Sequence, residues 1–171
     1  KGSDKTFVRP SETIPSHLKK FAHPTISGSQ LTNQGEELTT SHEMLIPYGA
    51  DGVLMSEEEA EDLISFFEME GNTEKLKART CAKRKPFYAF HDNAPLEEIN
   101  QGKIMCKDIT ESPQFWLDSE GLIVPRHTVY YIVPKEPKIL IELYEYLRSP
   151  EVKAWLMSKC QRAANGFIRI Q

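Results

Sequence analysis

The feature that most restricts the fold is a series of short apolar runs in the second half of the chain. "KPFYAF", "KIMCKDI", "QFWLD", "GLIV" and "TVYYIV" follow one another between residues 85 and 133, and "FIRI" stands near the C-terminal end. Clusters of Asn, Gly, Pro and Ser separate them, which is typical of strands joined by turns. Asp118–Gly121, "DSEG", predicts a hairpin between two of these strands.

Helical patterns flank this region. Ser56 with Glu59 forms a capping-box pattern before one apolar stripe, which predicts a helix over 56–70 that ends at Gly71. "TEKLKAR" predicts a shorter helix. Near the C-terminal end, one predicted face contains Ile139, Leu140, Leu143, Tyr146 and Leu147. Ser149 and Pro150 begin a further helix that presents Val152, Trp155 and Leu156. The chain is therefore expected to be α+β, with a mixed, mostly antiparallel sheet of short strands and flanking helices.

The N-terminal part has weaker patterns. "DKTFVRP" predicts an edge strand that ends at Pro10, and "EMLIPY" predicts a compact apolar strand. Residues 11–41 between them are rich in Ser, Thr, Gly, Asn and Gln, so we expect an irregular arm that is either packed or partly mobile. We interpret 1–171 as a single domain, with a strand and arm over 1–42 and the main body over 43–171.

Composition excludes several classes of protein. The chain has 171 residues, 39% of them hydrophobic and 27% charged, as in ordinary globular domains. No apolar run approaches the roughly 18 residues of a membrane span. The three cysteines form no C-x-x-C pair, and their odd number argues against a disulfide framework, so a reducing cytoplasm is expected. The five histidines give no zinc-binding spacing.

Known catalytic motifs are missing. There is no Gly-rich phosphate loop and no G-x-S-x-G elbow. Cys106 or Cys160 could be paired with His91 or His127 as thiol and imidazole, but each cysteine stands in an apolar stretch that favours a small buried side chain. The sequence therefore predicts no catalytic centre in this chain.

Charge is unevenly distributed. The net charge is −4, but residues 56–74 contain eight acids and no bases. The next seventeen residues contain six bases and no acids, and residues 122–171 contain eight bases against four acids. Local charge matters more than the total for a binding surface. A solvated acidic helix followed by a basic loop is the plainer interpretation of the first two segments.

Polar and basic side chains stand at the ends of the predicted strands and helices. In "LIVPRHTVYYIV", a cation, an imidazole and a hydroxyl interrupt two apolar runs, and we expect Val129, Tyr131 and Val133 to alternate into the core. Such side chains can bond phosphates and base edges. The candidate DNA-binding residues are Lys83, Arg84, Lys85, Lys103, Lys107, Arg126, His127, Thr128, Arg162, Asn165 and Arg169. Alternatively, Arg126 pairs with an acid such as Asp118 and orders the hairpin. The nearby aromatics Phe87, Tyr88, Phe115 and Trp116 are expected to be core residues.

The order of four stretches resembles a known family. "IPYGADGVLMSEEEAEDLISFF", "KARTCAKRKPFYAF", "KIMCKDITESPQFWLDSEGLIVPRHTVYYIVP" and "LRSPEVKAWLMSKCQRAANGFIRIQ" are similar to the TaqI-like C-terminal specificity domain. This is the target recognition domain of adenine-specific DNA methyltransferases of restriction-modification and phage-defence systems. The resemblance begins near Gly2 and covers most of the chain, though residues 10–40 match loosely.

The resemblance implies a function for the chain. It would recognise double-stranded DNA and position the target adenine for a separate N-terminal catalytic domain, which binds S-adenosylmethionine and carries an Asn-Pro-Pro-Tyr-type motif. This chain contains no Asn-Pro dipeptide, so we expect a fragment that binds no cofactor and has no enzymatic activity alone. The expected partners are DNA and the chain's own catalytic domain, in the cytoplasm of a bacterium or archaeon and not at a membrane.

Two alternatives remain from the residues themselves. The chain could be a protein-protein interaction module without direct DNA contact, in which the acidic helix 56–70 and the polar arm 11–41 dock on a partner. A freestanding hydrolase that uses Cys and His is the other alternative, and it predicts inactivation by thiol alkylation.

Overall fold

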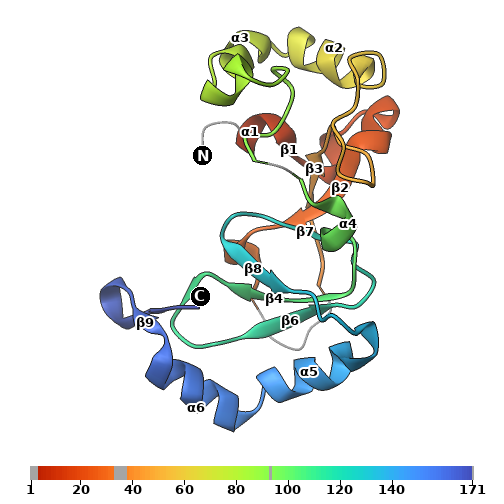
Figure 1. The fold of residues 1–171 in the computed structure, drawn as a ribbon. Helices are drawn as coiled ribbons and strands as arrows, with labels where there is room; N and C mark the ends of the chain where they lie inside the picture. Colours follow the sequence, from red (N-terminus) through yellow and green to blue (C-terminus); the bar gives the residue numbers. More distant parts are fainter. Residues whose placement is uncertain (1–3, 33–37, 93, 171) are drawn as a thin grey trace. The chain divides into compact units, whose positions relative to one another are not determined.

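The computed structural model describes residues 4–32, 38–92 and 94–170. The chain forms two compact units that interleave in sequence: unit 1 contains Lys1–Pro24 and Ser41–Glu98, and unit 2 contains Thr25–Thr40 and Ile99–Gln171. These boundaries do not coincide with the division expected at residue 42. Both units combine short helices with short strands (Figure 1), so the predicted α+β class is confirmed. Among the described residues, no helix is long and apolar enough to cross a membrane.

Unit 1 is mainly helical around strands that lie in the order β1-β3-β2, of which β1 and β3 are antiparallel. Its elements are α1 (Asp4–Phe7), β1 (Val8–Pro10), η1 (Ser11–Thr13), η2 (Ser16–Phe21), the first part of β2 (Ala22–Ile26), β3 (His42–Leu45), α2 (Glu61–Met69), α3 (Thr73–Lys77), η4 (Thr80–Lys83) and most of α4 (Leu96–Ile99).

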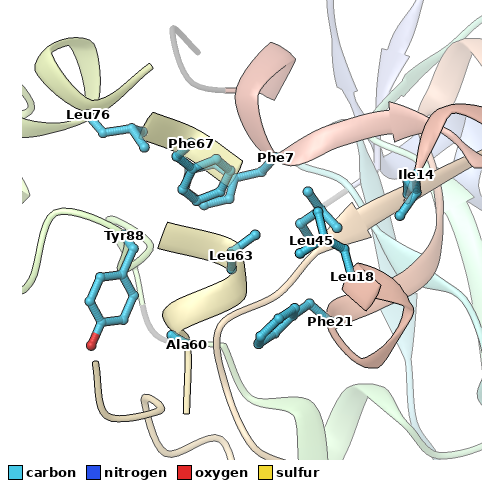
Figure 2. Close-up of a cluster of buried hydrophobic side chains, with 10 residues drawn as sticks. All are labelled: Phe7, Ile14, Leu18, Phe21, Leu45, Ala60, Leu63, Phe67, Leu76 and Tyr88. Carbon is cyan, nitrogen blue, oxygen red and sulfur yellow. The ribbon is translucent and has the colours of Figure 1, made fainter. Parts of the chain in front are cut away.

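The core of unit 1 is aromatic and aliphatic. Figure 2 shows Phe7 from α1 directed at Phe67 from α2, with Leu63 and Leu45 nearby. The rings of Phe7 and Phe67 meet edge to face, with centroids 5.2 Å apart. The predicted stripe of α2 is therefore the face that this core buries. The capping-box contact also forms, with the Ser56 N–H donating to the Glu59 carboxylate at 2.8 Å, but it lies in the turn before α2, which begins at Glu61 and not at the predicted residue 56.

Two predicted strands of unit 1 are wrong in part. Residues 4–7 of "DKTFVRP" form a helical turn, and the strand begins at Val8. "KPFYAF" forms turns instead of a strand, because the Arg79 guanidinium donates to the carbonyls of Phe87 and Ala89, at 2.5 and 2.8 Å. The described part of the arm 11–41 is packed: Leu18 and Phe21 have no exposed surface in unit 1. Residues 33–37 of the arm and the Gly2 start of the resemblance lie outside the described residues.

Unit 2 has a three-stranded sheet in the order β6-β4-β8 and a smaller sheet in the order β5-β10-β9, both antiparallel. Its elements are the end of β2, η3 (Gly28–Gln30), β4 (Lys103–Lys107), β5 (Ile109–Thr110), β6 (Phe115–Asp118), β7 (Val124–Pro125), β8 (Val129–Ile132), η5 (Pro137–Ile139), α5 (Leu140–Leu147), α6 (Pro150–Lys159), β9 (Gln161–Arg162), η6 (Ala164–Gly166) and β10 (Ile168–Arg169).

The sheet β6-β4-β8 is covered on both faces, as the buried run of β4 requires. Helix α5 lies against one face (Figure 1). There Leu140 and Tyr144 pack with Ile104, Cys106 and Phe115. On the other face, Met105, Trp116, Val129 and Tyr131 pack with Ile26 and Leu31. Val129 and Tyr131 therefore point into the core as expected, and Tyr88, Phe115 and Trp116 are buried core residues.

Two other expectations for unit 2 are corrected. Asp118–Gly121 is a turn, with Gly121 at φ 72°, but it does not close a hairpin. The strand that follows, β7, pairs in parallel with the end of β2, through Thr25 opposite Val124. Tyr146 is 63% exposed and Trp155 is 59% exposed, so neither belongs to a buried helix face.

A buried ion pair ties β4 to β6. Lys103 stands opposite Asp118, and its Nζ lies 2.5 Å from the carboxylate and 2.7 Å from the Ile99 carbonyl. The same carboxylate accepts the N–H groups of Leu122 and Ile123, at 3.1 and 2.9 Å. Burial lowers the pKa of the Lys103 ammonium from its ordinary value, and the Asp118 charge opposes that shift. The pair therefore holds the strand register and the turn after β6 together.

Breaking this pair should destabilise unit 2 strongly. Asp118→Asn leaves a buried ammonium without its counter-charge, and we expect a loss of about 3–5 kcal/mol in the free energy of unfolding. Urea titration followed by tryptophan fluorescence measures it, because Trp116 and Trp155 both belong to unit 2. Glu136→Gln is the control: it breaks the exposed Lys138–Glu136 pair, where we expect less than about 1 kcal/mol. Equal effects of the two substitutions would contradict the structural role.

Candidate nucleic-acid interface

The turn Arg126–Thr128 joins β7 to β8 at one end of the three-stranded sheet. The N–H of Val129 donates to the Arg126 carbonyl at 2.8 Å and closes the turn. His127 and Thr128 are exposed, and Arg126 is half-buried. The three polar residues that interrupt the two apolar runs therefore form one surface-facing turn. Such a turn can present a cation, an imidazole and a hydroxyl to a ligand.

The turn rests against η3, which lies almost a hundred residues earlier in the chain. The Gly28 N–H donates to the Thr128 hydroxyl at 2.8 Å, and the Arg126 N–H donates to the Ile26 carbonyl at 2.9 Å. The Arg126 guanidinium donates to the Gln30 side-chain carbonyl. The alternative pairing of Arg126 with Asp118 is not what the structure has, because the Asp118 carboxylate binds Lys103 and two backbone N–H groups.

Asp108 connects this turn to the C-terminal strands. Its N–H donates to the Thr128 carbonyl at 3.1 Å, and its carbonyl accepts the Ile170 N–H at 2.9 Å. Its carboxylate lies 3.6 Å from the Nε of Arg169, which is itself 41% exposed. The backbone of Asp108 therefore links the Arg126–Thr128 turn to the residue that follows Arg169.

Arg162 and Asn165 belong to the adjoining β9–β10 hairpin, where Arg162 stands opposite Ile168. Asn165 and Gly166 are the central residues of its turn, at φ 59° and 80°. An Asn-Gly pair with both φ angles positive is typical of a type I′ turn. Glycine adopts such a conformation without strain, and asparagine tolerates it better than most other residues. Both Arg162 and Asn165 are exposed, and Arg162 donates to the Met157 carbonyl at 3.2 Å.

The two lysines of β4 have different surroundings. Lys107 stands opposite Val129, at the end of the strand nearest the turn, with its ammonium 5.9 Å from the centre of the Trp116 ring. This distance permits a cation–π contact. Lys103 lies at the opposite end of β4, has no exposed surface and is paired with Asp118. We therefore retain Lys107 in the candidate interface and assign Lys103 to the core.

Lys83, Arg84 and Lys85 belong to unit 1. Lys83 ends η4 and Arg84 follows it, and both are exposed. The Lys85 ammonium donates to the His91 carbonyl at 3.3 Å. They form a separate basic loop. The residues that unit 2 brings to one end of its sheet are Lys107, Arg126, His127, Thr128 and Arg169, with Arg162 and Asn165 on the adjoining hairpin. We call this group the strand-end cluster.

The sequence-based predictions did not include three residues that contact the strand-end cluster and hold it: Gly28, Gln30 and Asp108. A signal for one of them is present, because Ser27 and Gln30 have the Ser-x-x-Gln spacing of a capping box. Both capping-box hydrogen bonds form in η3. Asp108 stands between two strands in "KIMCKDI", where an acid carries no distinctive signal.

The chemistry of the described residues does not favour a thiol or metal site. Cys106 is 2% exposed, and burial raises the pKa of its thiol to about 12, so a nucleophilic thiolate is disfavoured at neutral pH. Within the described residues, no three His, Cys, Asp or Glu side chains are grouped as metal ligands are. The strand-end cluster instead combines guanidinium, ammonium, imidazole, hydroxyl and amide groups, which is the set that contacts nucleic acids.

Comparison with known proteins finds similar folds among solved structures only. No model of a protein family matches the chain, and no curated protein matches it. Among solved structures, 17 chains match. One is the Type IIL restriction-modification enzyme MmeI in complex with DNA, with a TM-score of 0.62 and 15% sequence identity. The match covers 99% of this chain and 22% of that one. This chain therefore has the fold of a segment of a restriction-modification enzyme and spans about a fifth of that enzyme's length.

Alkylation should separate a buried thiol from a reactive one. We expect Cys106 in the folded protein to resist iodoacetamide at pH 8, because its pKa near 12 and its burial keep it a protonated, inaccessible thiol. The half-buried Cys160 serves as the internal control, and mass spectrometry of peptides measures both. Because the folded pKa is raised, the stability from the neutral Cys106 thiol is complete below pH 9 and is lost between about pH 9 and 12. Rapid native labelling of Cys106 would contradict the assignment.

Proposed function

We propose that this chain is a DNA-recognition domain of a restriction-modification protein and that the strand-end cluster contacts duplex DNA. The observation that carries the proposal is the convergence of Lys107, the Arg126–Thr128 turn and Arg169 at one end of a sheet, joined through the backbone of Asp108. The fold shared with a segment of a restriction-modification enzyme solved with DNA supports it.

The cluster has the groups that the task requires. Arg and Lys bind phosphates, and an Arg fork can bond two acceptors of guanine at once. The exposed Arg162 and the ammonium of Lys107 suit phosphate contacts, since a long flexible cation needs no fixed orientation there. Arg126 is half-buried and held by Gln30, so its guanidinium has the fixed direction that a base contact needs.

A more specific part of the proposal concerns the reaction. We propose that this chain is part of a longer protein, an S-adenosylmethionine-dependent, adenine-specific DNA methyltransferase of the bacterial or archaeal cytoplasm. Methylation of adenine in a duplex requires the base to leave the stack. This chain would hold the duplex in register while a separate catalytic domain flips and methylates the base. We assign neither a catalytic residue nor a cofactor-binding residue to the present chain, which alone would methylate nothing.

A second candidate is a protein-interaction module. Large apolar side chains on the C-terminal helices favour it: Ile141 and Tyr146 on α5 and Trp155 on α6 are all more than half exposed. The two functions differ in salt dependence. Counterion release makes DNA binding fall steeply with salt, whereas a largely apolar interface is much less sensitive.

DNA binding should be measured first with a labelled mixed-sequence duplex. We expect fluorescence anisotropy to show binding whose logarithm falls linearly with the logarithm of salt concentration, because phosphate contacts release counterions. Arg162→Ala should weaken binding to all sequences about equally and reduce the magnitude of the salt slope by about 1.

Lys138→Ala is the matched control. Lys138 is 80% exposed and follows β8 at the end opposite the Arg126–Thr128 turn. Its substitution by Ala therefore removes one positive charge, as Arg162→Ala does, but at a site outside the cluster. Affinity that is insensitive to salt, or an equal loss from both substitutions, would count against the strand-end cluster and favour the interaction module.

A further inference from the structure

The capping box of η3 directs the Gln30 side chain at the Arg126–Thr128 turn. Its carbonyl oxygen accepts the Ser27 N–H and the Ser27 hydroxyl, both at 3.0 Å, and also the Arg126 guanidinium. The N–H of Gln30 in turn donates to the Ser27 carbonyl at 2.9 Å. One oxygen thus joins the capping box of η3 to the guanidinium of a residue 96 positions further along the chain.

The backbone of η3 is fitted to the same turn. A Cβ on Gly28 would lie 2.9 Å from the Thr128 carbonyl and 3.3 Å from its hydroxyl, so a larger residue would collide with the turn. The Gly28 N–H holds that hydroxyl at 2.8 Å. Residues 27–30 therefore touch the turn at two points: at the side chain of Thr128 and at the side chain of Arg126.

We propose that Gln30 is a positioning residue for DNA sequence preference: it orients the Arg126 guanidinium for a base contact without contacting DNA itself. The inference rests on the proposed DNA-recognition function. A guanidinium has a planar fork whose bidentate bonds depend on direction, whereas phosphate attraction depends mainly on charge. Loss of the Gln30 contact should therefore reduce discrimination between bases much more than it reduces general affinity for DNA.

The test compares Gln30→Met, Gln30→Glu and Arg126→Lys in the full chain. Met has nearly the same length as Gln but removes the acceptor, and Glu keeps a carbonyl-type oxygen at the same position. Thr32→Ala and Thr32→Glu are the controls, because Thr32 is exposed two residues along and offers the same change of charge for the Glu variants. Each variant is measured by enrichment from randomised duplexes and by affinity for one mixed-sequence duplex. The NMR order parameter of the Arg126 Nε–H bond is measured without DNA.

Gln30→Met should lower the order parameter of Arg126 and leave affinity for the mixed duplex within about twofold. Preference should fall roughly tenfold at the base pair where Arg126→Lys also loses it, the low end of what a bidentate contact supplies. Gln30→Glu should restore both order and preference relative to Gln30→Met, and the Thr32 variants should change neither.

Three outcomes would overturn the inference, and they are distinguishable. An Arg126 that stays ordered in Gln30→Met shows that Gln30 does not position it. A disordered Arg126 with unchanged base preference shows that its orientation is not read. A wild-type chain without sequence preference, in which Gln30→Met still disorders Arg126, overturns the recognition role while the positioning contact itself stands.

Discussion

The buried Lys103–Asp118 pair is the constraint on which the arrangement of unit 2 depends. Two charges inside the sheet are stable only while every donor and acceptor around them is satisfied, and here the Ile99 carbonyl and the N–H groups of Leu122 and Ile123 complete the set. A slip in the β4–β6 register would leave these charges unpaired. The pair therefore holds the turn over 119–123 that follows β6, and β7 begins after that turn, at Val124.

The turn that this pair holds leads into β7, and β7 runs to the Arg126–Thr128 turn at the other end of the sheet. β7 pairs in parallel with the end of β2, and η3 follows β2 within two residues. The same pairing therefore brings η3 beside the turn that follows β7. The contacts of Gly28 with Thr128 and of Gln30 with Arg126 are thus consequences of sheet topology. A rigid frame of this kind is what a directional guanidinium contact requires.

Local patterns predicted the local structure. The capping box at Ser56, the stripe of α2 and the alternation of Val129 and Tyr131 follow from periodicities of a few residues. The predictions were wrong where a residue distant in the sequence determines the local structure or the burial of a side chain. "KPFYAF" has strand-like composition, but the Arg79 guanidinium binds two of its carbonyls and holds it in turns. Lys103 and Lys107 look alike in the sequence, and only the pairing of Lys103 with Asp118 across the sheet makes it a core residue. The strand-end cluster could be predicted as a set of polar interruptions, whereas its support by Gln30 depends on a contact across 96 residues.

Charge placement bears on how such a cluster could bind DNA in a chain with a net charge of −4. The segment with eight acids, 56–74, belongs to unit 1, and the strand-end cluster belongs to unit 2. Within the cluster, the Asp108 carboxylate faces Arg169 and offsets part of its charge. A surface built only for phosphate attraction would lose affinity from such an acid. In the proposed function, Arg169 would therefore add less to general DNA affinity than its formal charge implies.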